Sequence, residues 1–437
     1  MSDQRISRDL ALEHIRHHVQ AHPPRTQTVH VTEALGLVCA RDLFAAHASP
    51  PLPISSMDGY ALDSQATLGA SLESPVSFDI AGEIRPSTTA PAALLPGQAA
   101  VILTGGQIPA GADCAVPSEL AQVRDGRLVL TREFQPGEHI RPAGGDLKAG
   151  MRIARRGHDF TPAVLAALAV SGVMQAEAHL PPKTLVLALG NELAPLGGKN
   201  GGEDGDKNDG ENDGEDDGED GGGVAGRMPA DNLLLSAGLL RLRGLDSVKT
   251  EVCANDLGRI AARLTQALDC DCILTTGGTG PGQRDFILKA AGLAGFTPLF
   301  NGVTLTPGKS FFAAVRGRTI LLALPGTPWA VFALMHALVL PAVCWLRGRT
   351  VPIPGPILAR PLTMPPLAQP GWEKLVPCTI AAVGAELRAQ PLLDRSRETR
   401  RDMIEAQGLL IVSGLKEPDE LLPMIPIWEH RRGLRLD

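Results

Sequence analysis

The sequence predicts a multidomain protein of the α/β plus β class, with a three-layer α/β/α domain, an inserted β domain, a helical N-terminal region and a small C-terminal β domain. Two observations lead to this prediction. The chain has 437 residues, of which 44% are hydrophobic, and a chain of this length commonly divides into about two to four domains. Strand-like and helix-like segments also alternate in its second half, whereas short strands broken by glycine and proline fill much of its first half.

The first domain is expected to be a helical N-terminal or linker domain built from two separate segments, 1–50 and 147–181. Apolar residues repeat at helical spacing over residues 7–20, and residues 28–48 are expected to form a second amphipathic unit. A proline cluster at 50–53 ends this region. The chain is therefore predicted to leave a helical part, form another domain, and return to the helical part.

Residues 51–146 predict the inserted β domain. Hydrophobic runs at 76–80, 99–103 and 128–130 are short and contain β-branched residues, and glycine and proline separate them. This pattern is typical of short strands joined by tight turns. We therefore expect a small all-β unit within the helical region.

Residues 182–348 predict the α/β domain, because strand-like runs and helix-like segments follow one another along the chain. Alternation of this kind implies a parallel sheet with helices on both faces, which is a three-layer arrangement. The expected strands are 184–190, 247–253, 272–275 and 319–323, and the expected helices are 231–242, 256–268, 286–293 and 329–340.

Residues 349–437 are expected to form the C-terminal β domain, after a proline-rich boundary at 351–370. The segment 198–223 inside the α/β domain is rich in Gly, Asp, Glu and Asn, and it cannot bury enough apolar surface to become ordered. We expect a mobile loop there. Its acidic residues do not follow the spacing of a calcium-binding loop.

The formal net charge of −7 arises from one segment, because residues 203–220 (EDGDKNDGENDGEDDGED) carry more negative charge than this total. The rest of the chain is close to neutral and gives no general signal for nucleic acid binding, which an acidic segment would oppose. We expect no nucleic acid partner.

The cysteines and the apolar segments indicate the cellular compartment in which the protein is expected. The seven cysteines are widely spaced and include no C-x-x-C pair, which indicates structural thiols in a reducing, cytoplasmic compartment. The first residues carry charges throughout, and no secretory signal is visible. The apolar run 329–346 has about the minimum length of a membrane span, but it contains His336 and Pro341. We expect a buried core helix and no membrane partner.

The most informative stretch is TTGGTGPGQRD at residues 275–285, between a strand-like run and a helix-compatible segment. A glycine turn between a strand and a helix directs backbone N–H groups toward an anion, which indicates a phosphate cradle. The spacing matches neither a P-loop nor a dinucleotide-binding fingerprint. An ordinary turn of an α/β fold is the alternative at this stage.

In a doubly wound sheet, the loops that leave the carboxyl ends of the strands gather at one edge, where ligands bind. We therefore expect residues 190–192, 277–285 and 324–328 to lie close together. Lys309 in TPGKS would add a positive charge near the same edge, toward phosphate or another oxyanion, although an exposed lysine of no special role fits it equally well.

Glu192 and Asp285 are candidate ligands of Mg²⁺ at this edge. Magnesium commonly takes one or two carboxylates and completes its shell with water and substrate phosphates. Each acid taken alone fits the N-terminal turn of a helix equally well.

A series of motifs then runs through nearly the whole chain in a fixed order. They are SSMDGYAL (55–62), AGE (81–83), TGGQIPAGADCAVPSE (104–119), IRPAGGD (140–146), LGNEL (189–193), GGTGPGQRD (277–285), TPGKS (306–310), LPGTP (324–328) and AQGL (406–409). With this set the chain resembles the molybdopterin molybdenumtransferase family, which includes the bacterial MoeA proteins and the gephyrin E domain. The resemblance implies that the three-layer domain is the molybdopterin-binding domain.

The resemblance implies a homodimeric enzyme of four domains that performs the last step of molybdenum cofactor synthesis with Mg²⁺ as cofactor. In that step molybdate replaces AMP on adenylylated molybdopterin. The active cleft of such proteins lies between the α/β domain of one subunit and the inserted β domain of the other. Molybdopterin adenylyltransferase and apo-molybdoenzymes are the implied partners, and tungstate is open as an alternative to molybdate.

The resemblance also implies roles for individual residues. Asp58, Thr104 and Asp146 match the family's MDGYA, TGA-type and R-x-x-G-x-D motifs and are implied to be catalytic or cleft residues. Glu192 and Asp285 are implied to face Mg²⁺ and the pyrophosphate. The pterin and oxyanion pocket is implied to be lined by Gly277, Gly278, Gly282, Pro307, Gly308, Lys309, Pro325, Gly326 and Pro328.

Several positions depart from the family pattern. The usual GDEL is GNEL here, with Asn191; D-S-N becomes Ala230-Asp231-Asn232; and LPGNP becomes LPGTP through Thr327. The glycine turn is also closer to that of the molybdopterin adenylyltransferases, MogA and the gephyrin G domain. Two alternatives to molybdenum transfer are therefore open, namely adenylylation of molybdopterin with ATP and non-catalytic carriage of the pterin.

Overall fold

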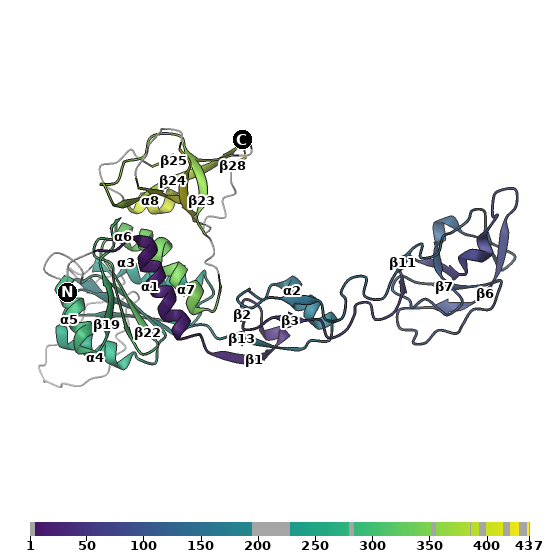
Figure 1. Cartoon of the computed structure of the whole chain (residues 1–437), viewed down its shortest axis with the longest axis horizontal. Coiled ribbons are helices and arrows are strands. Elements are labelled where there is room, and N and C mark those ends of the chain that lie inside the picture. Colours follow the sequence, from purple (N-terminus) through teal and green to yellow (C-terminus); the bar gives the residue numbers. More distant parts are fainter. Residues whose placement is uncertain are drawn as a thin grey trace, which may run out of the picture. The chain divides into compact units, whose positions relative to one another are not determined.

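The computed structural model describes residues 5–194, 228–278, 284–350, 355–384, 386–392, 399–413, 420–427 and 435–436. The chain forms two compact units (Figure 1), unit 1 with Met1–Gln27 and His179–Asp437, and unit 2 with Thr28–Ala178. Each unit is considered by itself below. The whole acidic segment expected to be a mobile loop, 198–223, lies outside the described residues, so this expectation stays a prediction.

The centre of unit 1 is a six-stranded sheet with the order β17-β14-β18-β22-β21-β19. Its first four strands are parallel and coincide closely with the predicted ones: β14 (Thr184–Leu189), β17 (Val248–Cys253), β18 (Cys272–Thr276) and β22 (Thr319–Leu324). Their continuous apolar runs are typical of parallel strands that are buried on both faces.

The other edge of this sheet corrects the prediction of a wholly parallel sheet. Strands β19 (Thr297–Asn301) and β21 (Phe312–Arg316) pair antiparallel with each other, and β21 also pairs antiparallel with β22. The reason is local, because only Gly317 and Arg318 connect β21 to β22 and such a short connection makes a hairpin. The sheet is therefore mixed.

Helices cover both faces of the sheet (Figure 1). Val186 of β14 packs in one core with Ile15 of α1, whereas its neighbour Leu187 packs in a second core with Ile260 of α4. This alternation follows from the two-residue repeat of a strand. The helices are α1 (Arg8–Ala21), α3 (Asp231–Arg241), α4 (Leu257–Gln266), α5 (Arg284–Leu293), α6 (Pro328–Leu334) and α7 (Leu340–Leu346).

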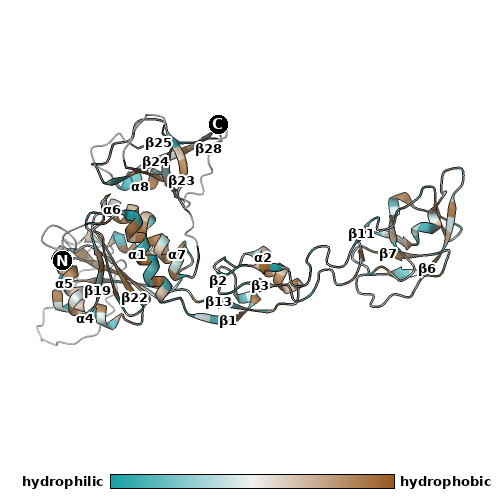
Figure 2. Ribbon diagram, viewed as in Figure 1, coloured by the Kyte–Doolittle hydropathy of each residue, from teal (hydrophilic) through white to brown (hydrophobic). Residues whose placement is uncertain are grey.

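The expected core helix at 329–346 is present as α6, a π-helical turn at Met335–Val339 and α7. The segment Pro328–Leu346 is long and apolar enough to cross a membrane by length and composition, but 89% of it is buried inside the protein. Inside it, His336 Nδ1 lies 2.9 Å from the Phe332 carbonyl oxygen. Figure 2 shows the contrast between buried and exposed parts of unit 1: central strands such as β22 are brown (hydrophobic), and parts of α1 are teal (hydrophilic).

The C-terminal part of unit 1 is a small barrel. Its strands follow the order β24-β25-β23-β27-β26, and β26 pairs again with β24, which closes the sheet. Short strands β20 and β28 attach to β24, and helix α8 (Arg400–Glu405) interrupts the predicted all-β pattern. The strands are β20 (Leu305–Thr306), β23 (Ile357–Pro361), β24 (Glu373–Val383), β25 (Glu386–Pro391), β26 (Gly408–Val412), β27 (Leu422–Pro426) and β28 (Arg435–Leu436).

Unit 2 contains a six-stranded sheet with the order β8-β5-β7-β6-β10-β9. The three runs predicted as strands are confirmed as β6, β7 and β10. A separate two-stranded ladder pairs β4 with β11. The bounds are β4 (Ile54–Ser55), β5 (Gly59–Leu62), β6 (Val76–Ile84), β7 (Gln98–Ile102), β8 (Cys114–Pro117), β9 (Gln122–Arg124), β10 (Arg127–Leu130) and β11 (Ile140–Arg141).

The predicted helical domain is wrong in two respects. Residues 28–48 form strands and a short 3-10 turn, because Thr and Val favour extended backbone and Gly36 interrupts the segment at φ +75°. Helix α1 packs into the core of unit 1 rather than with residues 147–181. The elements of this part are β1 (Thr26–His30), β2 (Val38–Cys39), β3 (Leu43–Phe44), β12 (Arg152–Ala154), α2 (Pro162–Val170) and β13 (Gln175–His179).

Candidate functional site

At the carboxyl edge of the unit 1 sheet, where the sequence predicted three loops to meet, Gly277 of the turn after β18 contacts the loop after β22 and the end of β14. Residues 279–283 of the turn lie outside the described residues. The Gly277 N–H donates to the Leu324 carbonyl oxygen over 3.1 Å. A Cβ on Gly326 would lie 3.3 Å from the Gly277 Cα. The turn after β18 therefore touches the loop after β22 through backbone atoms alone.

Gly277 also touches the end of β14. Its φ is +90°, and a Cβ at this position would lie 2.5 Å from the carbonyl oxygen of Leu189. Both the backbone conformation and the close approach therefore require glycine. Gly278 follows with a φ of +67°, and the next predicted residue of this turn, Gly282, lies outside the described residues.

Asn232 of α3 secures the loop after β22. Its side-chain Nδ2 donates to the Gly326 carbonyl oxygen over 2.8 Å. Its Oδ1 is buried, and among the described residues nothing donates to it. A buried acceptor without a donor is costly, so this atom is suited to a hydrogen bond from a ligand.

The two polar side chains of the GNEL loop after β14, Asn191 and Glu192, have different surroundings. Asn191 Oδ1 accepts a hydrogen bond of 2.9 Å from the Asn255 backbone N–H, so the residue that replaces the usual aspartate has a structural contact. Glu192 is exposed, and its carboxylate folds back over Gly190, where a Cβ would lie 2.6 Å from Oε1. No cation pairs with Glu192 in the described part of the chain.

The second predicted magnesium ligand, Asp285, lies in the first turn of α5, and its side chain is outside the described set. Within the described residues no three His, Cys, Asp or Glu side chains form a metal-binding group. One unpaired carboxylate beside a phosphate-type glycine turn still matches what Mg²⁺ needs, since this ion takes few protein ligands when a substrate supplies phosphates.

A cavity of about 690 Å³ opens beside these loops. This volume lies within the usual range for a small-molecule site. TPGKS and LPGTP both contribute to its wall, and three cationic side chains, Arg5, Lys309 and Lys374, line it. The other lining residues are Leu305, Thr306, Pro307, Gly308, Ser310, Pro325, Thr327, Ala330, Leu367, Ala368, Gln369 and Trp372.

Strand pairing explains how this cavity forms. β20 pairs in parallel with β24, so that Thr306 lies opposite Lys374 in the ladder. The Thr306–Pro307 peptide bond is cis, and Gly308 follows at φ +141°. The Arg5 Nε donates to the Lys309 carbonyl oxygen over 3.4 Å, which brings the start of the chain to the same wall.

Sequence reasoning missed Arg5, Trp372 and Lys374. Arg5 precedes α1, Trp372 directly precedes β24 and Lys374 is the second residue of β24, so each lies far along the chain from TPGKS. No local pattern marks them, because their position depends on a strand pairing and on the packing of α1 in the core of unit 1. Of the residues assigned to the pterin and oxyanion pocket, four line this cavity: Pro307, Gly308, Lys309 and Pro325. The other described ones, Gly277, Gly278, Gly326 and Pro328, are not among its lining residues, and Pro328 begins α6.

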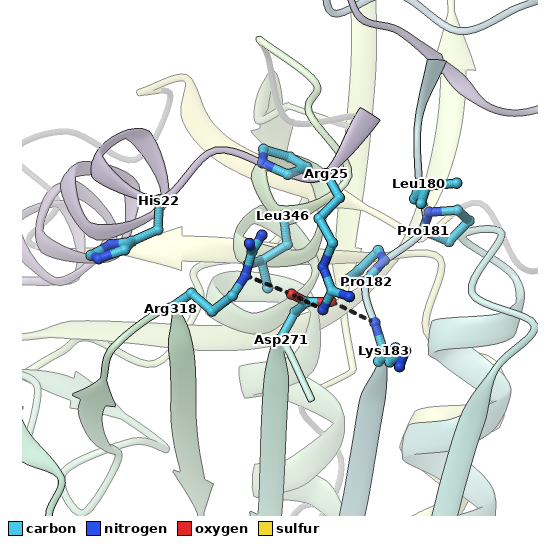
Figure 3. Close-up of a pocket in the computed structure, with 10 residues that line it drawn as sticks. His22, Arg25, Leu180, Pro181, Pro182, Lys183, Asp271, Arg318 and Leu346 are labelled. Carbon is cyan, nitrogen blue, oxygen red and sulfur yellow. Dashed lines mark hydrogen bonds and ion pairs between the residues drawn. The ribbon is translucent and has the colours of Figure 1, made fainter. Parts of the chain in front are cut away.

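A second cavity, of about 60 Å³, lies at the amino ends of the same strands and is too small for a nucleotide or a pterin. Its wall contains Asp271, which precedes β18 (Figure 3). The Asp271 carboxylate accepts from Arg318 Nε at 3.1 Å, from Arg25 Nη2 at 3.3 Å and from the Lys183 backbone N–H at 3.0 Å. Asp271 therefore has a structural role, because its carboxylate joins three separate segments of unit 1.

In unit 2 the structure brings two of the three predicted catalytic residues into contact. Asp58 Oδ1 accepts hydrogen bonds from the Thr104 backbone N–H at 2.6 Å and from the Thr104 hydroxyl at 2.7 Å. These two bonds, the backbone one first, lower the pKa of Asp58 from its ordinary value. The carboxylate is thus held ionised on an exposed loop.

Backbone packing explains why the MDGYA motif has a glycine, Gly59. A Cβ on Gly59 would lie 1.8 Å from the carbonyl oxygen of Val116, which precedes Pro117, the residue opposite Gly59 in the β5–β8 pairing. Only glycine permits this approach. Asp58 is therefore presented at the start of a strand whose first residue is fixed by backbone packing.

Asp146, the third predicted residue, follows the β4–β11 ladder. Its Oδ2 pairs with Arg141 Nη1 at 3.1 Å, and its backbone N–H donates to the Ser49 carbonyl oxygen over 3.0 Å. Both side chains of the pair are about half exposed, at 52% for Asp146 and 49% for Arg141. The structure gives no direct contact between Asp146 and Asp58 among the described hydrogen bonds.

Comparison with known proteins places the chain in a family. Residues 6–172 match the model of the MoeA N-terminal region (domain I and II), and residues 185–344 match the model of a probable molybdopterin binding domain. These two matches follow one another along the chain and together extend over most of it.

Individual relatives agree. The chain is 28% identical over 397 residues to a protein of Bacillus subtilis named molybdopterin molybdenumtransferase, with 89% of this chain and 86% of that protein covered. It is 28% identical over 330 residues to molybdopterin molybdenumtransferase 2 of Mycobacterium tuberculosis, with 74% and 76% covered.

The fold agrees as well. A crystal structure of the molybdopterin biosynthesis MoeA protein from Pyrococcus horikoshii OT3 matches with a TM-score of 0.74 at 20% identity, and it covers 97% of this chain and 100% of that one. Sequence motifs, family models and fold therefore coincide over the same residues, and the chain belongs to the MoeA family.

Proposed function

We propose that the protein is a molybdopterin molybdenumtransferase, which inserts molybdate into adenylylated molybdopterin and releases AMP during molybdenum cofactor biosynthesis. The observation that supports this most is the cationic cavity formed by TPGKS and LPGTP beside the glycine turn after β18. Such a site suits a substrate that carries a pyrophosphate together with a separate molybdate ion.

In this proposal the residues of unit 1 hold the anions. Lys309, Lys374 and Arg5 supply positive charge, and the glycines 277 and 278 bring backbone atoms close to the phosphates. The Oδ1 of Asn232 is available for an N–H group of the substrate. Binding of this kind brings two anions together and offsets their repulsion, and such positioning and electrostatic stabilisation lower the barrier of a reaction.

We also propose that Glu192 and Asp285 hold Mg²⁺ against the pyrophosphate. The exposed, unpaired carboxylate of Glu192 in the described structure and the position of Asp285 at the start of α5 support this. Bound there, Mg²⁺ would neutralise charge on the phosphoanhydride as it breaks. Charge neutralisation is the one role that we propose for Mg²⁺.

Asp58, Thr104 and Asp146 are proposed to act on the reacting groups, as the matching positions of the family motifs imply. The contact between Asp58 and Thr104 supports a shared role for these two residues. The ionised state of Asp58 suits the binding of a cation or the acceptance of a proton.

Several wider properties belong to the same proposal. We take residues 51–146 as an inserted β domain, 182–348 as the molybdopterin-binding domain and 349–437 as the C-terminal β domain. We further propose a cytoplasmic homodimer that exchanges its substrate and product with molybdopterin adenylyltransferase and apo-molybdoenzymes. Light scattering of the purified protein would test the dimer.

The adenylyltransferase alternative is not favoured, because the relatives over 89% and 74% of the chain are named molybdenumtransferases and the first 172 residues match the MoeA model. The carrier alternative rested on the loss of acidic contacts such as that at Asn191. That side chain supports a neighbouring backbone N–H instead, and Glu192 and Asp58 retain their carboxylates.

The test is to incubate the purified protein with adenylylated molybdopterin, Mg²⁺ and molybdate. AMP release should coincide with the capacity to reconstitute an apo-molybdoenzyme, and both should stop when molybdate is omitted. Tight binding of the pterin with neither AMP release nor reconstitution would refute the transferase proposal and favour a carrier.

A further inference from the structure

A tryptophan directly before strand β24 lines the candidate cavity, and neither the motifs nor the comparisons assign it a role. Trp372 is half-buried, lines the cavity and lies directly before Glu373 and Lys374. Its backbone N–H donates to the Gln369 carbonyl oxygen over 2.9 Å, which closes a turn. The indole ring is therefore part of a wall whose backbone is held on both sides.

The wall around this ring is cationic. Arg5, Lys309 and Lys374 line the same cavity. The one acidic neighbour in the sequence, Glu373, is paired with Arg8 Nε at 2.9 Å, and its backbone N–H donates to the Thr304 carbonyl oxygen over 3.0 Å. An anionic ligand thus meets positive charge around the ring.

The contact between Arg5 and Trp372 is looser than another arginine–aromatic contact of the same protein. The Arg5 Cζ lies 5.9 Å from the centroid of the Trp372 ring. In the same protein, Arg132 Cζ lies 3.9 Å from the centroid of the Phe134 ring, which is direct stacking. The Arg5 distance is longer by 2.0 Å (5.9 − 3.9), so the guanidinium group does not cover the face of the indole closely.

We propose that Trp372 and Arg5 form a stacking site for the flat heterocycle of the substrate, with Lys309 and Lys374 binding the anionic end of the same molecule. An aromatic plane inserted between a guanidinium group and an indole needs roughly 7 Å between them, twice a van der Waals separation. A displacement of about 1 Å by the flexible Arg5 side chain would provide this space. A tryptophan offers the largest aromatic face for such a ligand.

This inference rests on the proposed function for the identity of the heterocycle, a pterin. It assigns recognition of the ring to one pair of residues and recognition of the phosphates to another. The two halves of the site are therefore expected to bind separate fragments of the substrate independently.

The experiment uses the full-length protein and two probes in isothermal titration, the uncharged 6-hydroxymethylpterin and inorganic pyrophosphate. W372A should weaken pterin binding by tenfold or more and leave pyrophosphate binding within twofold of the wild type. W372F should restore most of the pterin affinity, because it retains an aromatic face. Lys374→Met should show the opposite pattern, with weaker pyrophosphate binding and nearly unchanged pterin binding.

Circular dichroism and melting curves of each variant establish that it is folded, and W372F serves where W372A does not fold. Equal pterin affinity in the wild type and W372A would overturn the stacking site, as would the absence of pterin binding to the wild type at millimolar concentration. If pterin binding depends on Trp372 but AMP is never released, the transferase proposal fails while the stacking site stands. If the wild type and W372A release AMP equally well, the transferase proposal stands while the stacking site fails.

Discussion

Thr104 donates two hydrogen bonds to a single oxygen of Asp58, from its backbone N–H at 2.6 Å and from its hydroxyl at 2.7 Å. Two residues 46 positions apart in the chain are thereby held as one polar group, where strand β5 begins and the neighbouring strand β7 ends. The first two predictions concern this pair.

Replacement of Asp58 by alanine should abolish AMP release and leave the fold intact. The carboxylate is exposed, so we expect the melting temperature to stay within about 2 °C of the wild type. Asp63→Ala is a matched control, because Asp63 is an exposed acid that caps a short turn in the same unit. Normal AMP release by the Asp58 variant would exclude a catalytic role for it.

Replacement of Thr104 by valine removes the hydroxyl donor and keeps the backbone one. The pKa of Asp58 should rise toward its ordinary value of about 3.9, because a bond that lowered it is gone. In the wild type the pKa of Asp58 is lower folded than unfolded, so its contribution to stability is present above the unfolded pKa and is lost as the pH falls through the folded pKa. NMR titration of the side-chain carboxyl would measure the change, and an unaltered pKa would mean that the hydroxyl has no effect.

A separate pH effect is expected at the end of α1. Burial lowers the pKa of His18, whose ring lies 4.6 Å from that of His22 and whose Nε2 lies 3.4 Å from the Arg318 carbonyl oxygen. A lowered pKa means that stability is fully present above the unfolded value of about 6.5 and is lost as the pH falls through the folded pKa.

The variant His18→Gln should therefore lose less melting temperature than the wild type between pH 7 and pH 5. His17→Gln, on the exposed side of the same helix, should behave like the wild type. Melting curves across this pH range provide the measurement. Parallel curves for the wild type and His18→Gln would contradict the assignment.

The glycine turn makes a prediction about stability. Gly277→Ala should destabilise the protein by about 1–3 kcal/mol from the backbone conformation alone, and further through contact with the Leu189 carbonyl oxygen. Gly292→Ala in α5 is the matched control, because a Cβ there meets nothing within 4 Å. It should stabilise by about 0.5–1 kcal/mol. Urea denaturation measures both, and equal effects of the two variants would refute the argument from close approach.

Asp271 is expected to stabilise unit 1. It accepts bonds from Arg318, Arg25 and the Lys183 backbone N–H, and its own side chain is 12% exposed. Asp271→Asn should cost about 1–3 kcal/mol, a range that allows for the partial exposure of both arginines. Asp269→Asn should cost almost nothing, since its contact with Lys183 is exposed and 3.9 Å long. Equal urea midpoints for the two variants would contradict this.

Local sequence patterns predicted the α/β half of the fold closely. The strands at 184–190 and 272–275 and the helices at 231–242 and 256–268 were located within a few residues of the observed elements. Buried parallel strands appear as continuous apolar runs and amphipathic helices repeat every three to four residues, so each carries its own signal. The segment 28–48 was predicted as amphipathic helical structure because scattered apolar residues in short strands imitate that repeat.

For the site, the glycine turn, TPGKS, LPGTP and the acidic residues could be located from the sequence alone, because glycine conformation and phosphate chemistry are encoded locally. That Arg5, Trp372 and Lys374 share a cavity with Lys309 emerges only from the folded protein. The hydrogen bond from Thr104 to Asp58 and the antiparallel pairings of β21 with β19 and β22 emerge in the same way. The physical reason is that strand pairing and helix packing join residues distant in the chain, and no local periodicity records which partners will meet.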